Sequence, residues 1–559
     1  MRKKETAQGL TVQAIAGTHV VLLGFNMAEA DCDGLLGFAI HRTDHTEDEA
    51  YWLTGLKTFA ETDPGLPPGS KYSTRKHPIQ SFSWADFSAK PGYDYTYRVH
   101  ALKGTPQALE SVARVRVRVQ TESPANGDHD IYFNRGAAAS QEYARRFGSR
   151  SPAEVGPAAF EWLSRGLYEA MLDFIGLASG PGFELRVCAY EFHYLPVLEA
   201  LQAAHQRGVK VAVIYDRRKD EPGERNDRAV EQIGLGDLCL KRTVNVSAIS
   251  HNKFMILLQD GQPQAVLTGS TNFSEGGIFG HSNVVHGVEE PEIAAAYLRY
   301  WDLLAADPKS VSLRPLLEAM YSLPAGKPTQ GTGVVFSPRR NLEALDWYAT
   351  LAAGAQTSLF ATFAFGMHPL FQEVYRTSSA KLRFALMEKA TRPMAAGPER
   401  EAEEAKIVSL RQLPENRFAI GAHLNLNRFD RWLQERLSGL NRNVRYIHTK
   451  YMLIDPLGDD PIIVAGSANF SAASTTDNDE NMLIIRGNRR VADIYLSEFM
   501  RLYNHYAFRE WAATQIEPNQ ATFNHLRTDV WWQRYFGDTE QSHQRQYFAG
   551  ENGEGMHRP

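Results

Sequence analysis

The chain has 559 residues, which exceeds one ordinary domain and predicts three or four folding units. Hydrophobic residues make up 43% of it and charged residues 22%, a composition that excludes a mostly disordered chain and supplies sizeable cores. The formal net charge of -5 argues against a module that binds nucleic acid through its overall charge, and it leaves a local basic groove open.

The N-terminus and the cysteines indicate the compartment. Polar residues separate the basic start of the chain from the short apolar segment 20–25, which disfavours a secretory signal. No apolar run approaches the roughly eighteen residues of a membrane span. The three cysteines (Cys32, Cys188 and Cys239) are scattered and odd in number, which favours buried free thiols in a reducing compartment. We therefore expect a cytoplasmic protein without stable membrane insertion.

Short strand-like segments dominate the first 120 residues. They lie at 20–25, 37–42, 93–99 and 112–119, and the last alternates apolar and basic residues as a half-buried strand does. The Pro-Gly turn before alternating Tyr and Val at 90–101, together with Gly-Phe-x-Ile-x-Arg at 37–42, resembles a fibronectin type III domain. The resemblance implies a β-sandwich over residues 8–121. A protein partner, substrate positioning and self-association all stay open as its role.

The chain repeats itself beyond a linker at 123–128. The matching segments are 130–136 with 333–339, 185–190 with 359–365, 209–216 with 382–388, 251–257 with 448–454, and 265–274 with 463–471. Each copy alternates apolar strand-like runs with helical stretches such as 195–207, which predicts α/β lobes with buried sheets. The predicted fold class is multidomain: an N-terminal all-β sandwich followed by two duplicated α/β lobes, at 128–325 and 326–540.

Four further segments carry weaker signals. Residues 1–8, the segment 394–406 and the polar tail after 541 are predicted to be mobile. The aromatic segment 530–536 is predicted to form a helix that docks on the second lobe, with contact to bases or lipid as the alternative.

One motif occurs twice inside the repeats: His-x-Lys, an apolar strand, and then Gly-Ser-x-Asn. The first copy is His251, Lys253, Gly269, Ser270 and Asn272, and the second is His448, Lys450, Gly466, Ser467 and Asn469. In a strand, residues two apart face the same side, so each His projects together with its Lys. The Gly allows a sharp turn, after which Ser and Asn offer neutral donors.

These residue types suit phosphodiester hydrolysis without a metal. Two Lys and two Asn can stabilise charge on the non-bridging oxygens. One His can attack phosphorus, and the other can protonate the leaving oxygen and then deprotonate water. Each piece alone is commonplace, because a single His on an apolar strand is usually a core residue and Gly-Ser-x-Asn is usually a turn. The full string in two matched repeats favours a shared site.

With this motif the sequence resembles the phospholipase D superfamily, whose pattern is His-x-Lys, four residues, Asp, and then Gly-Ser-x-Asn. The resemblance covers roughly residues 128–540. The second copy has the acid, Asp455, whereas the first has Leu258 in its place and Asp260 two residues later. The resemblance implies that this acid supports the local fold outside the phosphate site, so its loss leaves the first copy's His, Lys, Ser and Asn intact.

The resemblance also implies a carboxylate that follows Gly-Ser-x-Asn and orients the His of the opposite lobe. The second copy has Asp-Glu-Asn-Met at 479–482, and the first has His-Ser-Asn-Val at 281–284, without an acid. By that crossed pairing Glu480 would orient His251, which makes His251 the nucleophile and His448 the general acid and base. A solvated surface position for Glu480 is the alternative.

Other candidates rest on position alone. Glu191, His193 and His368 follow predicted strands, where residues of α/β folds line ligand crevices. The basic clusters 217–219 and 486–490 suit either phosphate contacts or a solvated face. We expect no metal site and no cofactor.

The motifs determine the type of bond and leave the substrate open. We expect a metal-independent phosphodiesterase that forms a phosphohistidine and acts as a nuclease on DNA or RNA. A phospholipase D-type lipid phosphodiesterase is one alternative. The other is an inactive module that binds nucleic acid or a protein partner.

Overall fold

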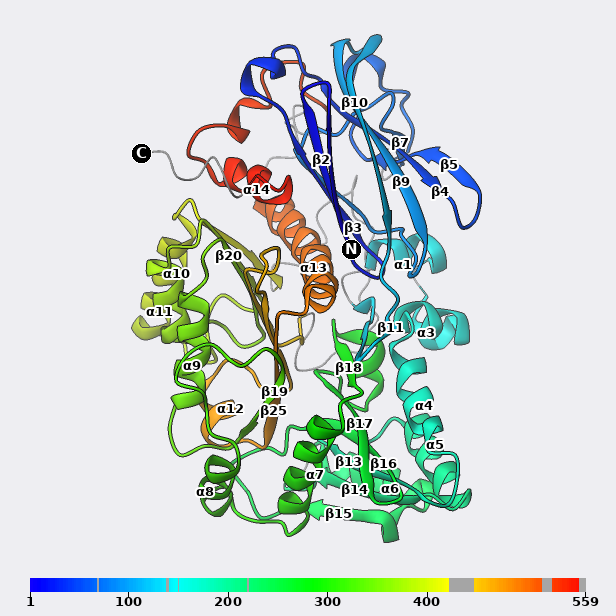
Figure 1. Cartoon of the computed structure of the whole chain (residues 1–559), viewed down its shortest axis with the longest axis vertical. Coiled ribbons are helices and arrows are strands. Elements are labelled where there is room, and N and C mark those ends of the chain that lie inside the picture. The colour runs from blue at the N-terminus through cyan, green and yellow to red at the C-terminus, as the bar shows by residue number, and fades with distance from the viewer. Residues whose placement is uncertain are drawn as a thin grey trace.

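Figure 1 shows the computed structural model of the chain, which describes residues 1–67, 70–136, 140–148, 150–218, 221–421, 447–514 and 525–551. An N-terminal β domain lies at one end of the molecule, and two α/β lobes make up the rest (Figure 1). In this description Cys32 and Cys188 are buried thiols and Cys239 is half-buried.

The N-terminal domain consists of two four-stranded antiparallel sheets and a two-stranded ribbon. The first sheet has the order β1-β2-β3-β8 (Arg2–Ala7, Leu10–Ala16, Val21–Asn26 and Ser83–Asp86). The second has the order β10-β9-β4-β5 (Ala108–Gln120, Asp94–Thr105, Gly37–Asp44 and Glu49–Trp52), and the ribbon pairs β6 (Thr54–Gly55) with β7 (Tyr72–Ser73). Residues from both sheets share one core, because alternate side chains of each strand point inward. The fibronectin type III resemblance and the boundaries 8–121, 128–325 and 326–540 stay predictions.

The two lobes have the same strand order. Lobe 1 runs β11-β12-β18-β17-β16-β13-β14-β15 (Ala125–Asn126, His129–Phe133, Val284–Val288, Gln262–Gly269, Lys253–Gln259, Phe183–Ala189, Lys210–Asp216 and Cys239–Arg242). Lobe 2 runs β19-β25-β24-β23-β20-β21-β22 (Gly331–Ser337, Glu480–Arg486, Ile462–Gly466, Tyr451–Ile454, Ser358–Phe363, Leu382–Met387 and Asn416–Ile420). In both, the last three strands are parallel and the others antiparallel. The predicted duplication of the lobes is therefore present for the seven strands of lobe 2, and β11 has no counterpart there among the described residues.

Helices cover both faces of these sheets, which explains why the strands are almost continuously apolar. In lobe 1 and the connection to lobe 2 they are α1 (Ser140–Phe147), α2 (Pro152–Val155), α3 (Pro157–Ser164), α4 (Leu167–Leu177), α5 (Leu195–Gln206), α6 (Gly223–Ile233), α7 (Pro291–Ala305) and α8 (Ser310–Met320). In lobe 2 and the tail they are α9 (Glu343–Ala353), α10 (Pro369–Thr377), α11 (Pro398–Arg411), α12 (Ala472–Thr476), α13 (Arg489–Thr514) and α14 (Glu540–Phe548). Across the described ranges, none of the helices is long and apolar enough to cross a membrane.

One hydrophobic core joins the two lobes. It contains residues of both sheets together with α7 and α13, including Phe254, Tyr297, Phe336 and Tyr495. Figure 1 shows α13 running from the lobes toward the N-terminal domain. This shared core holds the starts of β16 and β23, and hence the two His-x-Lys motifs, against each other.

Most of each described segment that was predicted to be mobile forms regular structure; residues 394–397 are irregular, and 552–559 of the tail lie outside the described residues. Residues 2–7 are β1, which pairs with β2, and residues 398–411 are α11. The tail forms α14, which packs on β3 so closely that a β-carbon on Gly24 would stand 2.1 Å from the carbonyl oxygen of Phe548. Their polar composition misled the prediction, because each is held by one apolar or hydrogen-bonded side.

The aromatic segment 530–536 does not dock on the second lobe as a helix. It forms a short 3-10 turn, η8 (Gln533–Tyr535), against the N-terminal domain. Trp531 belongs to the core of that domain, where its indole N–H donates to the carbonyl oxygen of Leu35 at 2.7 Å and its ring packs on Phe82. An indole that is buried needs an acceptor, and Leu35 supplies it.

Candidate active site

The structure brings the two motif histidines together from opposite lobes. The ring centroids of His251 and His448 lie 6.3 Å apart, and each residue is 5% exposed. Each backbone is attached to the other lobe: His251 N–H donates to the carbonyl oxygen of Asp479 at 2.9 Å, and His448 N–H donates to that of Ser282 at 3.3 Å. Parallel bridges join the same segments, so the two halves of the site are related by a pseudo-two-fold axis.

A buried carboxylate holds the first histidine. Glu480 begins β25, is 0% exposed, and has its Oε2 2.9 Å from Nδ1 of His251. The same oxygen accepts from the Ser467 hydroxyl at 2.7 Å. Burial works to raise the pKa of Glu480, yet His251 and Lys253 hold it below its usual value. An ionised carboxylate at this point fixes which ring nitrogen of His251 carries the proton. The solvated surface position considered for Glu480 is therefore wrong.

The second histidine has a neutral partner in the equivalent place. Nδ1 of His448 lies 3.0 Å from Oδ1 of Asn283, and that oxygen also accepts from the Ser270 hydroxyl at 2.8 Å. The backbone pairs Gly269 with Val285 as it pairs Gly466 with Met482, so Asn283 is the counterpart of Glu480. The sequence pairing of 281–284 with 479–482 was one residue out of register and missed Asn283. Counting finds it: Asn283 follows Asn272 at the same distance as Glu480 follows Asn469.

The two lysines lie beside the histidines and are buried. Nζ of Lys450 donates to the carbonyl oxygen of His448 at 2.5 Å, and Nζ of Lys253 donates to that of His251. Burial lowers the pKa of Lys253 to about 8, against the raising effect of Glu480. Burial, followed by the charge of Lys253, lowers the pKa of Lys450 well below its usual value. The site therefore concentrates positive charge that the protein alone compensates incompletely.

The histidines share this environment. Burial lowers the pKa of His251 to about 4; Glu480 opposes the shift and Lys253 adds to it. Burial, with Lys450 next, lowers the pKa of His448 well below its usual value. Both imidazoles are thus neutral near pH 7 in the free protein, as a nucleophilic imidazole must be.

The Gly-Ser-x-Asn segments are shaped by close backbone contact. A β-carbon on Gly269 would lie 2.3 Å from the carbonyl oxygen of Val284, and one on Gly466 would lie 2.2 Å from that of Asn481. Only glycine fits at either place. The buried amide oxygens of Asn272 and Asn469 have no hydrogen-bond partner among the residues the structure describes. Both amides can therefore engage a ligand.

Asp455 supports the fold of lobe 2, as the resemblance implied. Its carboxylate accepts from the backbone N–H groups of Gln356, Thr357 and Ser358 at 2.8, 2.7 and 2.9 Å. In lobe 1 the strands continue past Leu258, and Asp260 takes the turn instead. Asp260 and Asp455 both have positive φ (49° and 48°); the Asp260 N–H donates to the carbonyl oxygen of Gly182, just before β13, and the Asp455 N–H donates to that of Ser358, the first residue of β20. Asp260 thus occupies the turn, but among the described residues its carboxylate accepts none of the backbone hydrogen bonds that Asp455 accepts.

A cavity of about 850 Å³ opens beside the histidines. It is lined by Tyr190, Glu191, His193, Tyr194, Leu195, Pro196, Glu221, Pro222, Arg225, Ser274, Glu275, Gly276 and His281. Two aromatic residues of the cavity lining contact the motif histidines. The ring centroid of Tyr190 lies 5.1 Å from that of His251, and the ring of His281 stacks on His448 with a centroid distance of 5.2 Å. The predicted substrate residues Glu191 and His193 line this cavity, where Glu191 accepts from the Ser274 hydroxyl at 2.5 Å.

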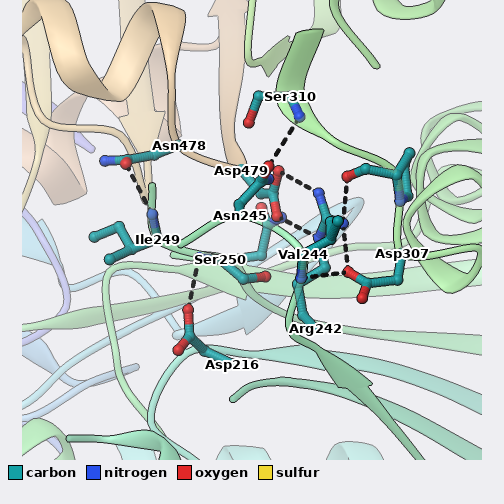
Figure 2. A network of polar contacts seen from close by, with 12 residues as sticks. Asp216, Arg242, Val244, Asn245, Ile249, Ser250, Asp307, Ser310, Asn478 and Asp479 are labelled. Carbon is teal, nitrogen blue, oxygen red and sulfur yellow. Dashed lines mark hydrogen bonds and ion pairs between the residues drawn. The ribbon is translucent and has the colours of Figure 1, made fainter. Parts of the chain in front are cut away.

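A polar network behind the site ties the lobes together (Figure 2). Arg242, at the end of β15, donates through Nε and Nη2 to the carboxylate of Asp479 at 2.9 and 3.2 Å, and through Nη1 to Asp307 at 2.7 Å. Asp216 accepts from the Ser250 N–H at 2.9 Å. Asp479 precedes Glu480, and Ser250 precedes His251. By holding Asp479 and Ser250, the network fixes the backbone positions of Glu480 and His251, which meet in the site. Sequence reasoning missed it, because no local pattern marks a partner 237 residues away.

The remaining candidates serve the structure. Within the basic clusters, Arg217 pairs with Asp227 and Arg486 with Asp460, while Lys219 lies outside the described residues. His368 caps α10 by accepting from the Leu370 N–H at 3.3 Å. No group of three or more His, Cys, Asp or Glu with metal-binding geometry occurs in the ranges that the structure describes.

Comparison with known proteins places this architecture. Residues 172–304 and 353–503, more than half of the chain, match the family model described as "Cardiolipin synthase, PLD-like domain". No curated protein matches the chain. Among solved structures it is similar to polyphosphate kinase of Porphyromonas gingivalis (16% identity, 58% of this chain, TM-score 0.36). That match spans 46% of the kinase, less than half of its length.

Two further solved structures are similar over most of their own length. Phosphatidylserine synthase of Haemophilus influenzae Rd KW20 has 13% identity, covers 60% of this chain and 84% of the synthase, and has a TM-score of 0.42. Nuc of Salmonella typhimurium, a phospholipase D family member, has 26% identity, covers 24% of this chain and 84% of Nuc, and has a TM-score of 0.21. The family match over more than half of the chain, in two segments that carry the paired motifs, shows that this protein belongs to the phospholipase D superfamily.

Proposed function

We propose that the protein is a nuclease that cleaves phosphodiester bonds through a phosphohistidine on His251, with His448 as general acid and base. The observation that carries this proposal is the asymmetric pair of contacts: His251 to the carboxylate of Glu480 at 2.9 Å, and His448 to the amide of Asn283 at 3.0 Å. The carboxylate keeps a proton on Nδ1 of His251, so its Nε2 lone pair is available.

The reaction takes two steps that use these atoms. Nε2 of His251 attacks phosphorus, the bond from phosphorus to the leaving oxygen breaks, and protonated His448 gives its proton to that oxygen. His448 then takes a proton from water, the water oxygen bonds to phosphorus, and the bond to His251 breaks. Glu480 stabilises the positive charge that the His251 ring carries while it is bonded to phosphorus.

A bound phosphodiester corrects the charge balance of the empty site. Lys253 and Lys450 are buried and lack full compensation, and the amide N–H groups of Asn272 and Asn469 can donate to phosphate oxygens. A phosphate anion placed among them raises the pKa of both lysines and of His448, because opposite charge favours the protonated form. Substrate binding therefore favours uptake of a proton from solvent by His448, and the first step consumes that proton.

The cavity supports a nucleotide beside the phosphate. Its tyrosines offer stacking surfaces, and the carboxylate of Glu191 accepts hydrogen bonds from the amino groups of a base. A specific observation favours a second candidate, a phospholipid with an amine-bearing head group. Glu221 and Glu275 also line the cavity, and three carboxylates beside tyrosine rings suit an ammonium group.

A cleavage assay in EDTA separates these candidates. Labelled single- and double-stranded DNA, RNA and vesicles of amine-bearing phospholipids are incubated with the protein and with His251→Ala. His205→Ala, a change on the exposed end of α5, is the matched control. We expect nucleic-acid cleavage by the parent and the control and none by His251→Ala. Turnover of lipid without cleavage of nucleic acid would show that a phospholipid is the substrate. Equal activity of all three proteins would refute the role of His251.

A further inference from the structure

The N-terminal domain has one sheet against the lobes and one facing away. The first sheet carries β3, on which α14 packs, and β2, which contacts α13. The second sheet, β10-β9-β4-β5, lies on the outer side of the domain (Figure 1). Its inner side chains, such as Val115, Val117 and Tyr97, are in the domain core. On its other face, among the described residues, Arg114 and Arg116 are exposed and Arg98 and Trp52 are half-buried, so these side chains can reach a ligand.

Cations run across this outer face from strand to strand. The register places Arg116 beside Arg98, Arg98 beside His41, and His41 beside Trp52. Directly opposite residues of an antiparallel sheet point to the same face. The next pair on the same face of β10 and β9, two residues further along each strand, places Arg114 beside His100. This set, together with Arg75, is called the arginine face below.

Most of these charges are uncompensated. Arg75, Arg98, Arg114 and Arg116 make no ion pair with any residue in the part of the chain that the structure describes. Arg118 differs, because its Nε donates to Asp94 at 3.0 Å. Two arginines on one strand, Arg116 and Arg118, thus give an internal comparison between a free and a neutralised charge. The pKa of His100 is lowered by burial and then by neighbouring cations, which agrees with a concentrated positive potential.

Aromatic rings lie among the cations. The Trp52 ring is 5.1 Å from His41 and 5.3 Å from His100 between centroids, and the guanidinium of Arg75 stands 5.6 Å over it. A hollow of about 320 Å³ opens here, lined by Gln8, Trp52, Arg75, His100, Ser111, Val112 and Arg114. Stacking rings beside cations that follow a backbone are the two elements with which proteins hold single-stranded nucleic acid.

We propose that the arginine face binds a single strand of nucleic acid, with its phosphates on Arg98, Arg114 and Arg116 and a base stacked at Trp52. Charge complementarity selects a polyanion, and Trp52 lines the hollow beside Arg75, whose flexible side chain a stacking base would displace from the ring. A membrane contact would instead need the ring to project. The face lies outside the two lobes and acts independently of the histidine pair, so the inference goes beyond the proposed nuclease activity and does not depend on it.

Binding is measured with the full chain carrying His251→Ala, so that turnover cannot change the probe. Fluorescence anisotropy with a labelled single-stranded DNA oligonucleotide compares this parent with Arg98→Gln/Arg114→Gln/Arg116→Gln. We expect a roughly 10- to 100-fold weaker Kd for the triple variant at low salt. We also expect its slope of log K against log salt to fall by about 2, from roughly 0.7 per lost phosphate contact.

Further variants and a melting measurement distinguish a loss of binding at the arginine face from a general loss of charge and from unfolding. A lobe 2 variant removes the same charge at exposed lysines far along the chain: Lys381→Gln, Lys389→Gln and Lys406→Gln. We expect it to bind like the parent, and Arg118→Gln, which loses a neutralised charge, to change Kd less than Arg116→Gln does. Trp52→Ala should weaken binding roughly tenfold and leave the salt slope unchanged. Thermal melting of each variant shows that it is folded.

Three outcomes would overturn the proposal. They are a parent that does not bind the oligonucleotide, a triple variant that binds like the lobe 2 control, and a loss confined to vesicles of phosphatidylglycerol while oligonucleotide binding persists. The last assigns the face to an anionic membrane. Failure here is distinct from failure of the nuclease proposal, because cleavage by the chain with an intact His251 is measured separately.

Discussion

Replacing Glu480 by Gln changes one atom of the side chain and removes the negative charge next to His251. The carboxylate accepts from His251 at 2.9 Å and from the Ser467 hydroxyl at 2.7 Å. A hydrogen bond to a charged group contributes about 1.5–3 kcal/mol. The bond to His251 strengthens as the ring gains positive charge on phosphorylation, so its loss falls on the chemical step. We expect kcat to drop about 10- to 150-fold with little change in KM.

The pH dependence gives an independent readout with a defined sign. Activity needs neutral His251, whose pKa is lowered to about 4, so kcat/KM falls as the pH drops through about 4. Glu480 raises that pKa, so the Gln variant should have its acid limb at lower pH together with a lower plateau. Initial rates on a labelled oligonucleotide measure both. Glu191→Gln is the matched control, because it removes a cavity carboxylate and should alter KM. An unchanged plateau, or an acid limb at higher pH, refutes the orienting role of Glu480.

Three further outcomes are expected. With a 4-nitrophenyl phosphodiester, whose leaving group needs no acid, His448→Ala should accumulate a phosphohistidine that phosphorus labelling detects, and His251→Ala should form none. Arg242→Met leaves the buried carboxylate of Asp479 without its ion-pair partner and should lower the free energy of unfolding in urea by about 3–5 kcal/mol; a loss below about 1 kcal/mol contradicts this. Asp455→Asn should cost about 1–3 kcal/mol in the same assay, and Asp260→Asn close to nothing, since the structure shows backbone donors only around Asp455 within the described ranges.

The lobes could be predicted from sequence because duplication repeats their apolar runs. Each run is a strand buried on both faces, and matching one copy to the other reveals the order of elements without any tertiary information. The family resemblance predicted the crossed contact between Glu480 and His251. The equivalent contact of His448 with Asn283 could have been predicted from the spacing of the motifs alone. The departure at Leu258 also has a local explanation: Asp260 and Gly261, both at positive φ, form the tight turn that the longer strands need.

Contacts between distant segments could not be predicted. The tail after 525 is polar, yet Trp531 and α14 return to the N-terminal domain, because a few apolar side chains suffice to hold a segment whose average composition is hydrophilic. The arginine face has the same origin. Arg114 and Arg116 alternate with buried valines in one strand, but their charge gathers with Arg98 and Arg75 only once the sheet has formed. Overall charge therefore says little about a local surface.

The crossed arrangement suggests why both half-sites lie in one chain. Each histidine is held by the strand that begins in the other lobe, so neither lobe alone can position its own imidazole. In an assembly of two identical chains, any change in the partner of one histidine would change both. Within a single duplicated chain the partners can differ, and here they do: a carboxylate at 480 and an amide at 283. In the mechanism we propose, the charged partner suits His251, which would carry a bond to phosphorus, and the neutral partner suits His448, which would accept and release a proton.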